Sequence, residues 1–162
     1  MSEEQQIKIL ETNLSRLLQW IAAAEARVSV VLGIATAMLG SMAIFAPAAK
    51  TWPIGIWVMV CLTLFFIGGS LVCLSKASFP RTNGPKGSLL YFEGIKARDL
   101  YEYRLAMKSL TLSMYIDDLT DQCHVNAQIA SLKYSWLKNS QIYLFASIIP
   151  WTSTLFCLYQ AK

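Results

Sequence analysis

The sequence of 162 residues has little charge and few of the side chains that enzymes use. Charged residues make up 15% of it, whereas about 25% is typical of soluble globular domains. It has a single histidine, His124, no Gly-rich phosphate loop, no paired nucleophile motif and no cluster at metal-ligand spacing. We therefore expect neither an enzyme nor a resident metal or cofactor.

The positions of the four cysteines argue against a protein held together by disulfides or zinc, and the distribution of charge argues against a nucleic-acid-binding protein. Cys61, Cys73 and Cys157 lie in apolar runs and only Cys123 lies in a polar segment, so the sequence contains neither a disulfide framework nor a zinc site. The net charge is +4, but acidic residues are interspersed with the basic ones. We therefore predict no nucleic-acid partner.

Hydrophobic residues make up 55% of the sequence, and many of them form three long apolar runs. Each is close to the roughly 17–25 residues that a helix needs to cross a bilayer, and none contains Asp, Glu, Lys, Arg or His. A period-two alternation typical of barrel strands is missing, so lipid would require helices. We predict an all-α membrane protein with transmembrane helices at residues 28–49, 54–74 and 141–159.

The basic residues predict the orientation. Residues 75–140 contain many of them: Lys76, Arg81, Lys86, Lys96, Arg98, Arg104, Lys108, Lys133 and Lys138. Because basic residues near membrane spans remain in the cytoplasm, we expect this segment and residues 1–27 to be cytoplasmic. The N-terminus then lies inside and the C-terminus outside.

Residues 1–27 have the pattern of an amphipathic helix that continues directly into the first span. Apolar residues recur at steps of three and four: Ile7, Leu10, Leu14, Leu17, Ile21, Ala24 and Val28. This apolar seam either pairs protomers in a coiled coil or packs on the chain's own cytoplasmic helices. Its length does not decide between the two, and we expect a homo-oligomer.

Residues 75–140 predict a helical region that begins with a loop. Asn83-Gly84 and two prolines mark the loop, and residues 89–92 are compatible with a strand or a helical turn. A helical apolar pattern returns from about Ala97, as two helices or one broken helix, and continues into the third span. With the N-terminal helix, this region should form a small helical cytoplasmic domain.

Hydrogen-bonding side chains are concentrated around the histidine. On a helix, Asp117, Asp121, His124 and Gln128 share one face, and Asp118, Gln122 and Asn126 form an adjacent stripe. Amide and imidazole groups can bind the edge of a planar ring, although a solvated face or contacts between helices are equally compatible with the pattern. Arg81, directly after Pro80, can bind a phosphate bidentately or simply be a topology-setting charge.

Several blocks along the chain resemble the transmembrane effectors of bacterial Pycsar antiphage systems. They are Trp20-Ile21, Ala24-Glu25-Ala26-Arg27, Phe79-Pro80-Arg81, Tyr91-Phe92-Glu93-Gly94-Ile95, the stretch from Gln122 to Ala130, and Lys133-Tyr134. Where that family often has Asp-x-Lys before the first span, this chain has Glu25-Ala26-Arg27, which keeps both charges.

The resemblance implies an abortive-infection effector in the bacterial inner membrane. A companion cyclase would make a cyclic pyrimidine mononucleotide, cUMP or cCMP, and this protein would sense it and impair the membrane. By analogy, Arg81, Gln122, His124 and Asn126 are the candidate ligand-binding residues. The main alternative is a small oligomeric channel or regulatory subunit without a nucleotide ligand; a constitutive, holin-like lesion former is disfavoured by the large polar segments.

Overall fold

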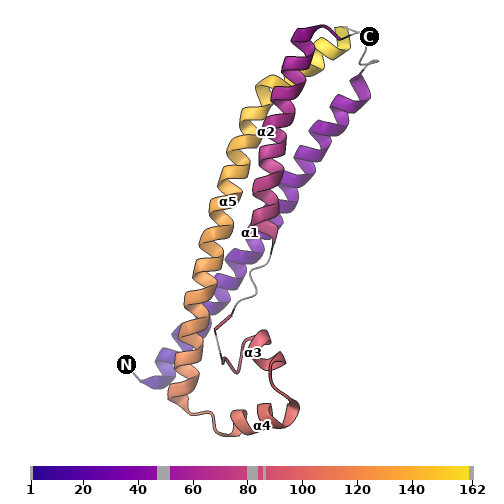
Figure 1. Ribbon diagram of the computed structural model, residues 1–162. Helices are drawn as coiled ribbons and strands as arrows, with labels where there is room; N and C mark the ends of the chain where they lie inside the picture. Colours follow the sequence, from indigo (N-terminus) through magenta and orange to yellow (C-terminus); the bar gives the residue numbers. More distant parts are fainter. Residues whose placement is uncertain (1, 47–51, 80–83, 86, 161–162) are drawn as a thin grey trace. The chain divides into compact units, whose positions relative to one another are not determined.

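The computed structural model describes residues 2–46, 52–79, 84–85 and 87–160, and most of these residues are helical (Figure 1). In chain order the helices are α1 (Glu3–Phe45), α2 (Ile54–Ser78), α3 (Phe92–Lys96), α4 (Leu100–Lys108) and α5 (Leu112–Gln160). No strand occurs within these ranges. Three of the helices, α1, α2 and α5, are long and apolar enough to cross a membrane. The prediction of an all-α membrane protein with three transmembrane helices is confirmed.

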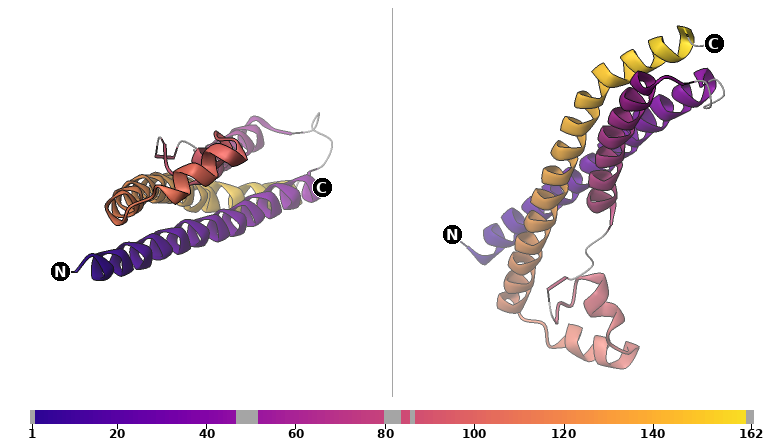
Figure 2. Two further views of the ribbon diagram at one scale, coloured as in Figure 1. Left: turned by 90° about the horizontal axis from the view of Figure 1, so that it is seen from below. Right: turned by 45° about the horizontal axis from the view of Figure 1, so that its top comes forward.

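Two of the spanning helices are much longer than a bilayer requires (Figure 2). α1 has 43 residues and α5 has 49; at 1.5 Å per residue these are roughly 65 and 75 Å long, against about 30 Å of hydrocarbon. Each helix therefore has a membrane segment and a polar extension without a break between them. This confirms the predicted continuity at both the first and the third span.

Side-chain and backbone chemistry accounts for where the helices begin and end. At the start of α1, the Ser2 hydroxyl accepts from the Gln5 amide and the Gln5 side chain accepts from the Ser2 amide, which is a capping box. α2 ends at Ser78 because Phe79 is extended, with ψ 115°, as expected before a proline.

Two helix ends differ from the ends of the predicted membrane spans. α1 ends at Phe45, within the predicted span of residues 28–49: Ala46 is not helical, because it precedes a proline, and residues 47–49 lie outside the described residues. α2 continues to Ser78, four residues beyond the predicted span end at Leu74. In the run at residues 89–92, residues 89–91 form bends and Phe92 begins the short helix α3.

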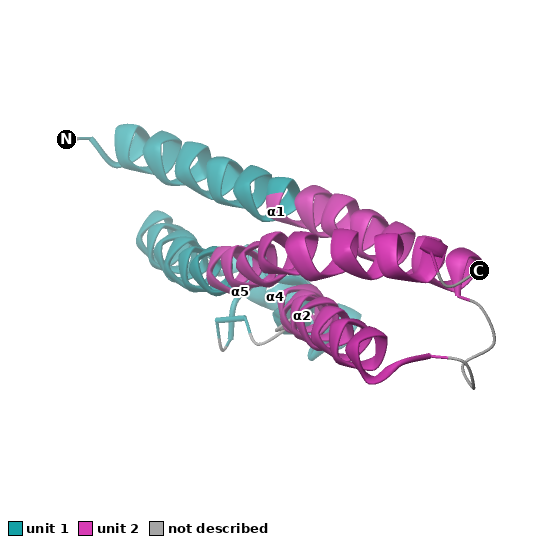
Figure 3. Cartoon of the chain, turned by 90° about the horizontal axis from the view of Figure 1, so that it is seen from above, with its two compact units in different colours: residues 1–23, 80–132 teal, residues 24–79, 133–162 magenta. Residues whose placement is uncertain are grey.

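The chain divides into two compact units (Figure 3). Unit 1 comprises residues 1–23 and 80–132, and unit 2 comprises residues 24–79 and 133–162. α1 and α5 each contribute to both units.

Unit 2 is a three-helix bundle whose buried residues follow a heptad pattern. In α2 the buried positions recur at steps of four and three: Ile56, Val60, Thr63, Ile67, Ser70, Leu74 and Ala77. α5 repeats the pattern with Leu137, Ser140, Leu144, Ser147, Thr154 and Leu158. Such spacing gives knobs-into-holes packing of helices that cross at a small angle, so side chains fill the interior of the bundle.

Small polar residues lie where α2 and α5 meet. Thr63 is 3.1 Å from Thr154 and Ser70 is 2.8 Å from Ser140, hydroxyl to hydroxyl, and all four side chains are fully buried. Small residues allow the helix backbones to approach closely, and their hydroxyl groups provide hydrogen bonds between helices in a membrane. α1 joins this pair mainly through apolar residues, among them Val31, Ala35 and Met38.

Candidate ligand groove in unit 1

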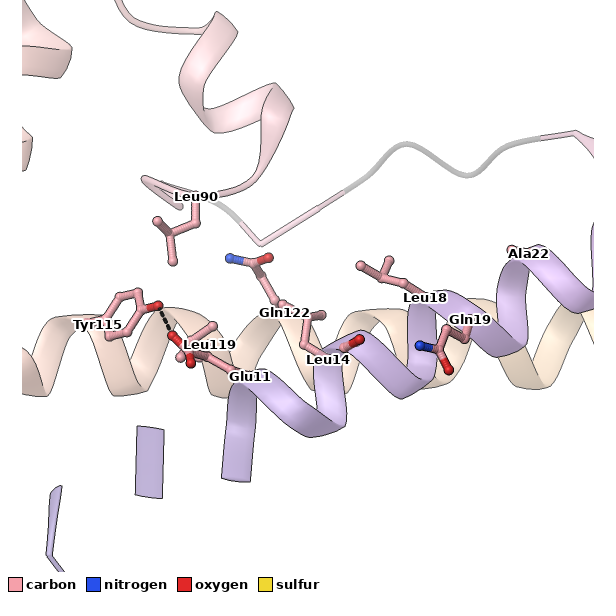
Figure 4. Close-up of a pocket in the computed structure, with 10 residues that line it drawn as sticks. Glu11, Leu14, Leu18, Gln19, Ala22, Leu90, Tyr115, Leu119 and Gln122 are labelled. Atoms are coloured by element: carbon pink, nitrogen blue, oxygen red, sulfur yellow. Dashed lines mark hydrogen bonds between the residues drawn. The ribbon is translucent and has the colours of Figure 1, made fainter. Parts of the chain in front are cut away.

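Unit 1 contains an open groove of about 630 Å³ between the polar part of α1, the N-terminal part of α5 and one loop residue (Figure 4). This volume lies within the roughly 300–1,000 Å³ typical of small-molecule sites. Ten residues line it: Glu11, Leu14, Ser15, Leu18, Gln19, Ala22, Leu90, Tyr115, Leu119 and Gln122.

Helical periodicity brings these side chains together. The α1 residues follow steps of three and four, which place them on one side of the helix, and Tyr115, Leu119 and Gln122 do the same on α5.

The apolar seam of α1 is partly buried, and the Cys123 thiol of α5 lies 3.5 Å from the Leu10 carbonyl oxygen. Within unit 1 part of this seam contacts α5 of the same chain, and the partly exposed remainder leaves the pairing of protomers a prediction.

One end of the groove is closed by a hydrogen bond between the two long helices. The Tyr115 hydroxyl donates to Glu11 Oε1 at 2.7 Å, as the dashed line in Figure 4 shows. This hydrogen bond raises the pKa of the Tyr115 phenol, with smaller contributions from burial and from the negative charge of Glu11. The phenol thus remains a neutral donor at physiological pH.

Asp118 holds Gln122, a buried polar side chain of the groove. Gln122 is 6% exposed and its Nε2 donates to Asp118 Oδ1 at 3.2 Å. The other oxygen of Asp118 accepts from the Leu89 amide at 2.9 Å. One carboxylate therefore fixes both the Gln122 carboxamide and the loop that places Leu90 over it.

The same loop is held by a buried hydroxyl and a guanidinium. The Ser88 hydroxyl accepts from the amides of Leu90 and Tyr91. Arg98 donates to the carbonyl oxygens of Gly87, Ser88 and Gly94 at 2.6 to 2.9 Å. Gly87 and Ser88 belong to a short non-helical segment, whose carbonyl groups have no helix or sheet partner, and Gly94 belongs to α3, so Arg98 ties this segment to α3.

The predicted ligand residues lie at different places. Gln122 lines the groove, and Asn126, one turn further, is buried and donates to the Gln122 carbonyl oxygen at 2.8 Å. His124 is exposed on another side of α5, where its Nε2 lies 2.9 Å from Gln128 Nε2. Arg81 lies outside the described residues. The structure thus brings Gln122 and Asn126 together, and His124 apart from them.

Sequence reasoning missed most of the groove. Its polar lining residues Glu11, Ser15, Gln19 and Tyr115 had not been singled out, because their roles depend on contacts between segments far apart in the chain. Asp118 was placed in the polar stripe with Gln122, but its contact with the Leu89 amide was not foreseen. The only available signal was periodicity, since Tyr115 lies one heptad before Gln122 on the same helix face.

The lining combines an apolar floor with a few polar groups. The side chains of Gln19 and Gln122 offer amide donors and acceptors, and Ser15 and Tyr115 offer hydroxyls. The lining includes one carboxylate, Glu11, and no lysine or arginine, so an anionic ligand would take its countercharge from another residue. Among the residues described, no group of three or more His, Cys, Asp or Glu side chains could hold a metal ion.

Comparison with known proteins gives one match. The family model for the Pycsar effector protein domain matches residues 9–160, a stretch that contains the groove and all three membrane helices. No curated protein and no solved structure matches the chain. Because the family match covers nearly the whole sequence, the chain belongs to the Pycsar effector family and is a membrane effector of antiphage defence.

Proposed function

We propose that the protein senses a cyclic pyrimidine mononucleotide, cUMP or cCMP, made by a partner cyclase, and then impairs the inner membrane. The infected cell would die or stop growing before the phage is released. The observation that carries this proposal is the family match over residues 9–160, since the family implies a cyclase and a cyclic nucleotide signal. The match includes both a groove of suitable volume and the membrane bundle.

The groove supports a ligand with a planar, hydrogen-bonding edge. With one Nε2 hydrogen of Gln122 bonded to Asp118, its carboxamide oxygen is an acceptor for a ring N–H or an exocyclic amine. Uracil has such a donor at N3 and cytosine has one at N4, so this contact accepts either base. Arg81 remains our predicted partner for the cyclic phosphate, and His124 and Asn126 remain candidates.

The membrane bundle constrains how the effector acts. Because side chains fill the interior of unit 2, a single resting bundle provides no polar path across the bilayer. Impairment therefore requires the helices to rearrange or several copies to associate, and we infer a homo-oligomer. The ligand must bind the active arrangement more tightly than the resting one, since only differential affinity shifts such an equilibrium.

The proposed topology places the groove where a cyclase product would be found. The basic residues between the second and third spans predict a cytoplasmic location for that segment, and residues 1–23 share unit 1 with most of it. The N-terminus would then be inside and the C-terminus outside.

Membrane potential, followed with a voltage-sensitive dye in bacteria, tests the function directly. Cells express the protein with a cyclase that makes cUMP, cCMP, cAMP or cGMP. Depolarisation with one pyrimidine nucleotide alone is the expected result. A response to no nucleotide would contradict the proposal and favour an oligomeric channel or regulatory subunit without a nucleotide ligand.

Matched glutamine variants of α5 test the site. Gln122→Ala should abolish the response at unchanged protein level, whereas Gln128→Ala, on the exposed side of the same helix, should retain it. If Gln128→Ala or His124→Ala abolishes the response and Gln122→Ala does not, the ligand binds the exposed face and the groove is not the site.

A further inference from the structure

Unit 2 contains a buried lysine that joins all three membrane helices. Lys133 of α5 is 8% exposed, and its ammonium donates to Glu25 Oε1 of α1 and to the Ala77 carbonyl oxygen of α2, each at 3.1 Å. We call Glu25, Ala77 and Lys133 the Lys133 cluster.

The contact to Ala77 satisfies a carbonyl that the helix itself leaves open. α2 ends at Ser78, and the last four carbonyl groups of a helix have no intrahelical partner. Ala77 is 1% exposed, which leaves its carbonyl little access to water. A positive charge also interacts favourably with the C-terminal end of a helix dipole. Lys133 is therefore both a cap for α2 and a partner for α1.

The position of the cluster within the chain gives it particular importance. The chain passes between the two units after residues 23, 79 and 132 (Figure 3). Each member of the Lys133 cluster belongs to unit 2 and lies within two positions of one of these crossings. Any displacement of α1, α2 or α5 relative to the other two at this end of the bundle must break or stretch one of the two contacts.

The chemistry of the cluster suits a contact that can be released. The Glu25 side chain is 60% exposed, so its carboxylate is largely hydrated already and its ion pair with Lys133 is weak. The ammonium itself is buried and would gain hydration on release, which offsets part of the lost attraction. Nearby, Arg27 lies over the Tyr134 ring at 5.8 Å and Lys76 over the Trp136 ring at 4.6 Å, and these pairs add further contacts between the same helices.

We propose that the Lys133 cluster holds the membrane helices in their resting arrangement, and that its release accompanies the change that impairs the membrane. This inference rests on the proposed function. It requires that removal of the cluster shifts the equilibrium between the resting and the active state toward the active state in the absence of the nucleotide.

Lys133→Met is the most direct test, because methionine retains an unbranched chain and lacks the ammonium. Since a hydrogen bond to a charged group is worth roughly a tenfold factor in an equilibrium, the variant should depolarise cells without any cyclase. Where it is not fully active alone, it should need about tenfold less cyclase inducer. Lys133→Arg, which keeps the donors, should behave more like the wild type.

Lys138→Met is the matched control, since Lys138 is exposed on the same helix; it should leave the cyclase dose unchanged. Glu25→Gln should shift the dose in the same direction as Lys133→Met by a smaller factor, and it tests the idea even if Lys133→Met does not accumulate in membranes. A Lys133→Met protein that accumulates normally and needs the wild-type cyclase dose would overturn the proposal. A Glu25→Gln protein that needs as much cyclase inducer as the wild type, or more, would also overturn it.

The two proposals fail in different ways. If the wild type responds to no cyclase while Lys133→Met depolarises cells alone, the nucleotide signal is wrong and the cluster stands. Suppose instead that the wild type responds, and that Lys133→Met does not depolarise cells without a cyclase and needs the same dose of cyclase inducer as the wild type. The proposed role of the cluster is then wrong and the proposed function stands.

Discussion

Replacing Ser140 by leucine should destabilise the membrane bundle, although leucine is the better residue for contact with lipid. Ser140 is fully buried and its hydroxyl lies 2.8 Å from that of Ser70. Hydrogen bonds between membrane helices average about 0.6 kcal/mol, and extra carbon atoms in a packed core cost about 1–3 kcal/mol. We therefore expect Ser140→Leu to lower the unfolding free energy by about 1.6–3.6 kcal/mol, and Ser140→Ala by about 0.6 kcal/mol.

Unfolding of the purified protein in mixed micelles by increasing SDS, followed by tryptophan fluorescence, measures both values. Ala146→Leu is the control, because Ala146 is exposed on the same helix and a leucine there would point away from the core. It should leave the midpoint unchanged. A Ser140→Leu protein as stable as the wild type, or an equal loss in Ala146→Leu, would refute close packing of α2 against α5.

Three further predictions concern unit 1. Gly94→Ala should weaken it, because a Cβ at this position would collide with the Ser88 carbonyl oxygen; limited proteolysis should then cut the segment before α3 faster, and equal cleavage rates would contradict the contact. Tyr115→Phe should remove a phenol that titrates above pH 10, which ultraviolet absorbance can follow. The hydrogen bond to Glu11 raises the pKa of this phenol in the folded protein. The hydrogen bond therefore contributes fully to stability below pH 10, and this contribution is lost as the pH rises through the folded pKa. Burial raises the pKa of the Cys123 thiol, so a water-soluble maleimide at pH 7.5 should label it more slowly in the folded than in the unfolded protein, and equal rates would refute its burial.

The membrane part of the fold was predictable because its signal is local. A run such as residues 54–74 without charge has only a helical solution in lipid, and an uninterrupted periodic pattern before Val28 predicts a continuous helix. Hydropathy alone does not locate the helix end at Phe45, because the apolar run continues through Ala49, whereas Ala46 precedes a proline, which disfavours helical backbone there.

The groove was less predictable because long-range contacts form it. Glu11 and Tyr115 are 104 positions apart, and no local pattern indicates that they meet. Separation of His124 from Gln122 does follow from helix geometry, since residues two apart point in nearly opposite directions. The grouping of both residues came from the family blocks, which indicate shared sequence and not a shared face.

Lys133 shows what a local rule could have found. Ala130, Leu137 and Leu144 are buried on α5, and Lys133 occurs in phase with them. A charged residue in an apolar seam rarely lacks a specific partner. Periodicity could thus have indicated its burial, but not the identity of Glu25 and Ala77 as its partners.

The unbroken course of α5 fixes a rotational register along its whole length. Polar residues spaced seven apart, Asn126, Lys133, Ser140, Ser147 and Thr154, are all buried. Inserting one residue between Asn126 and Lys133 would rotate the part of α5 after the insertion by about 100° relative to the part before it. Ser140, Ser147 and Thr154 would then no longer continue the buried seam that contains Asn126. Inserting seven would nearly restore the phase. Length variation in this helix is therefore expected in steps of about a heptad, whereas the connections outside the helices have no such constraint.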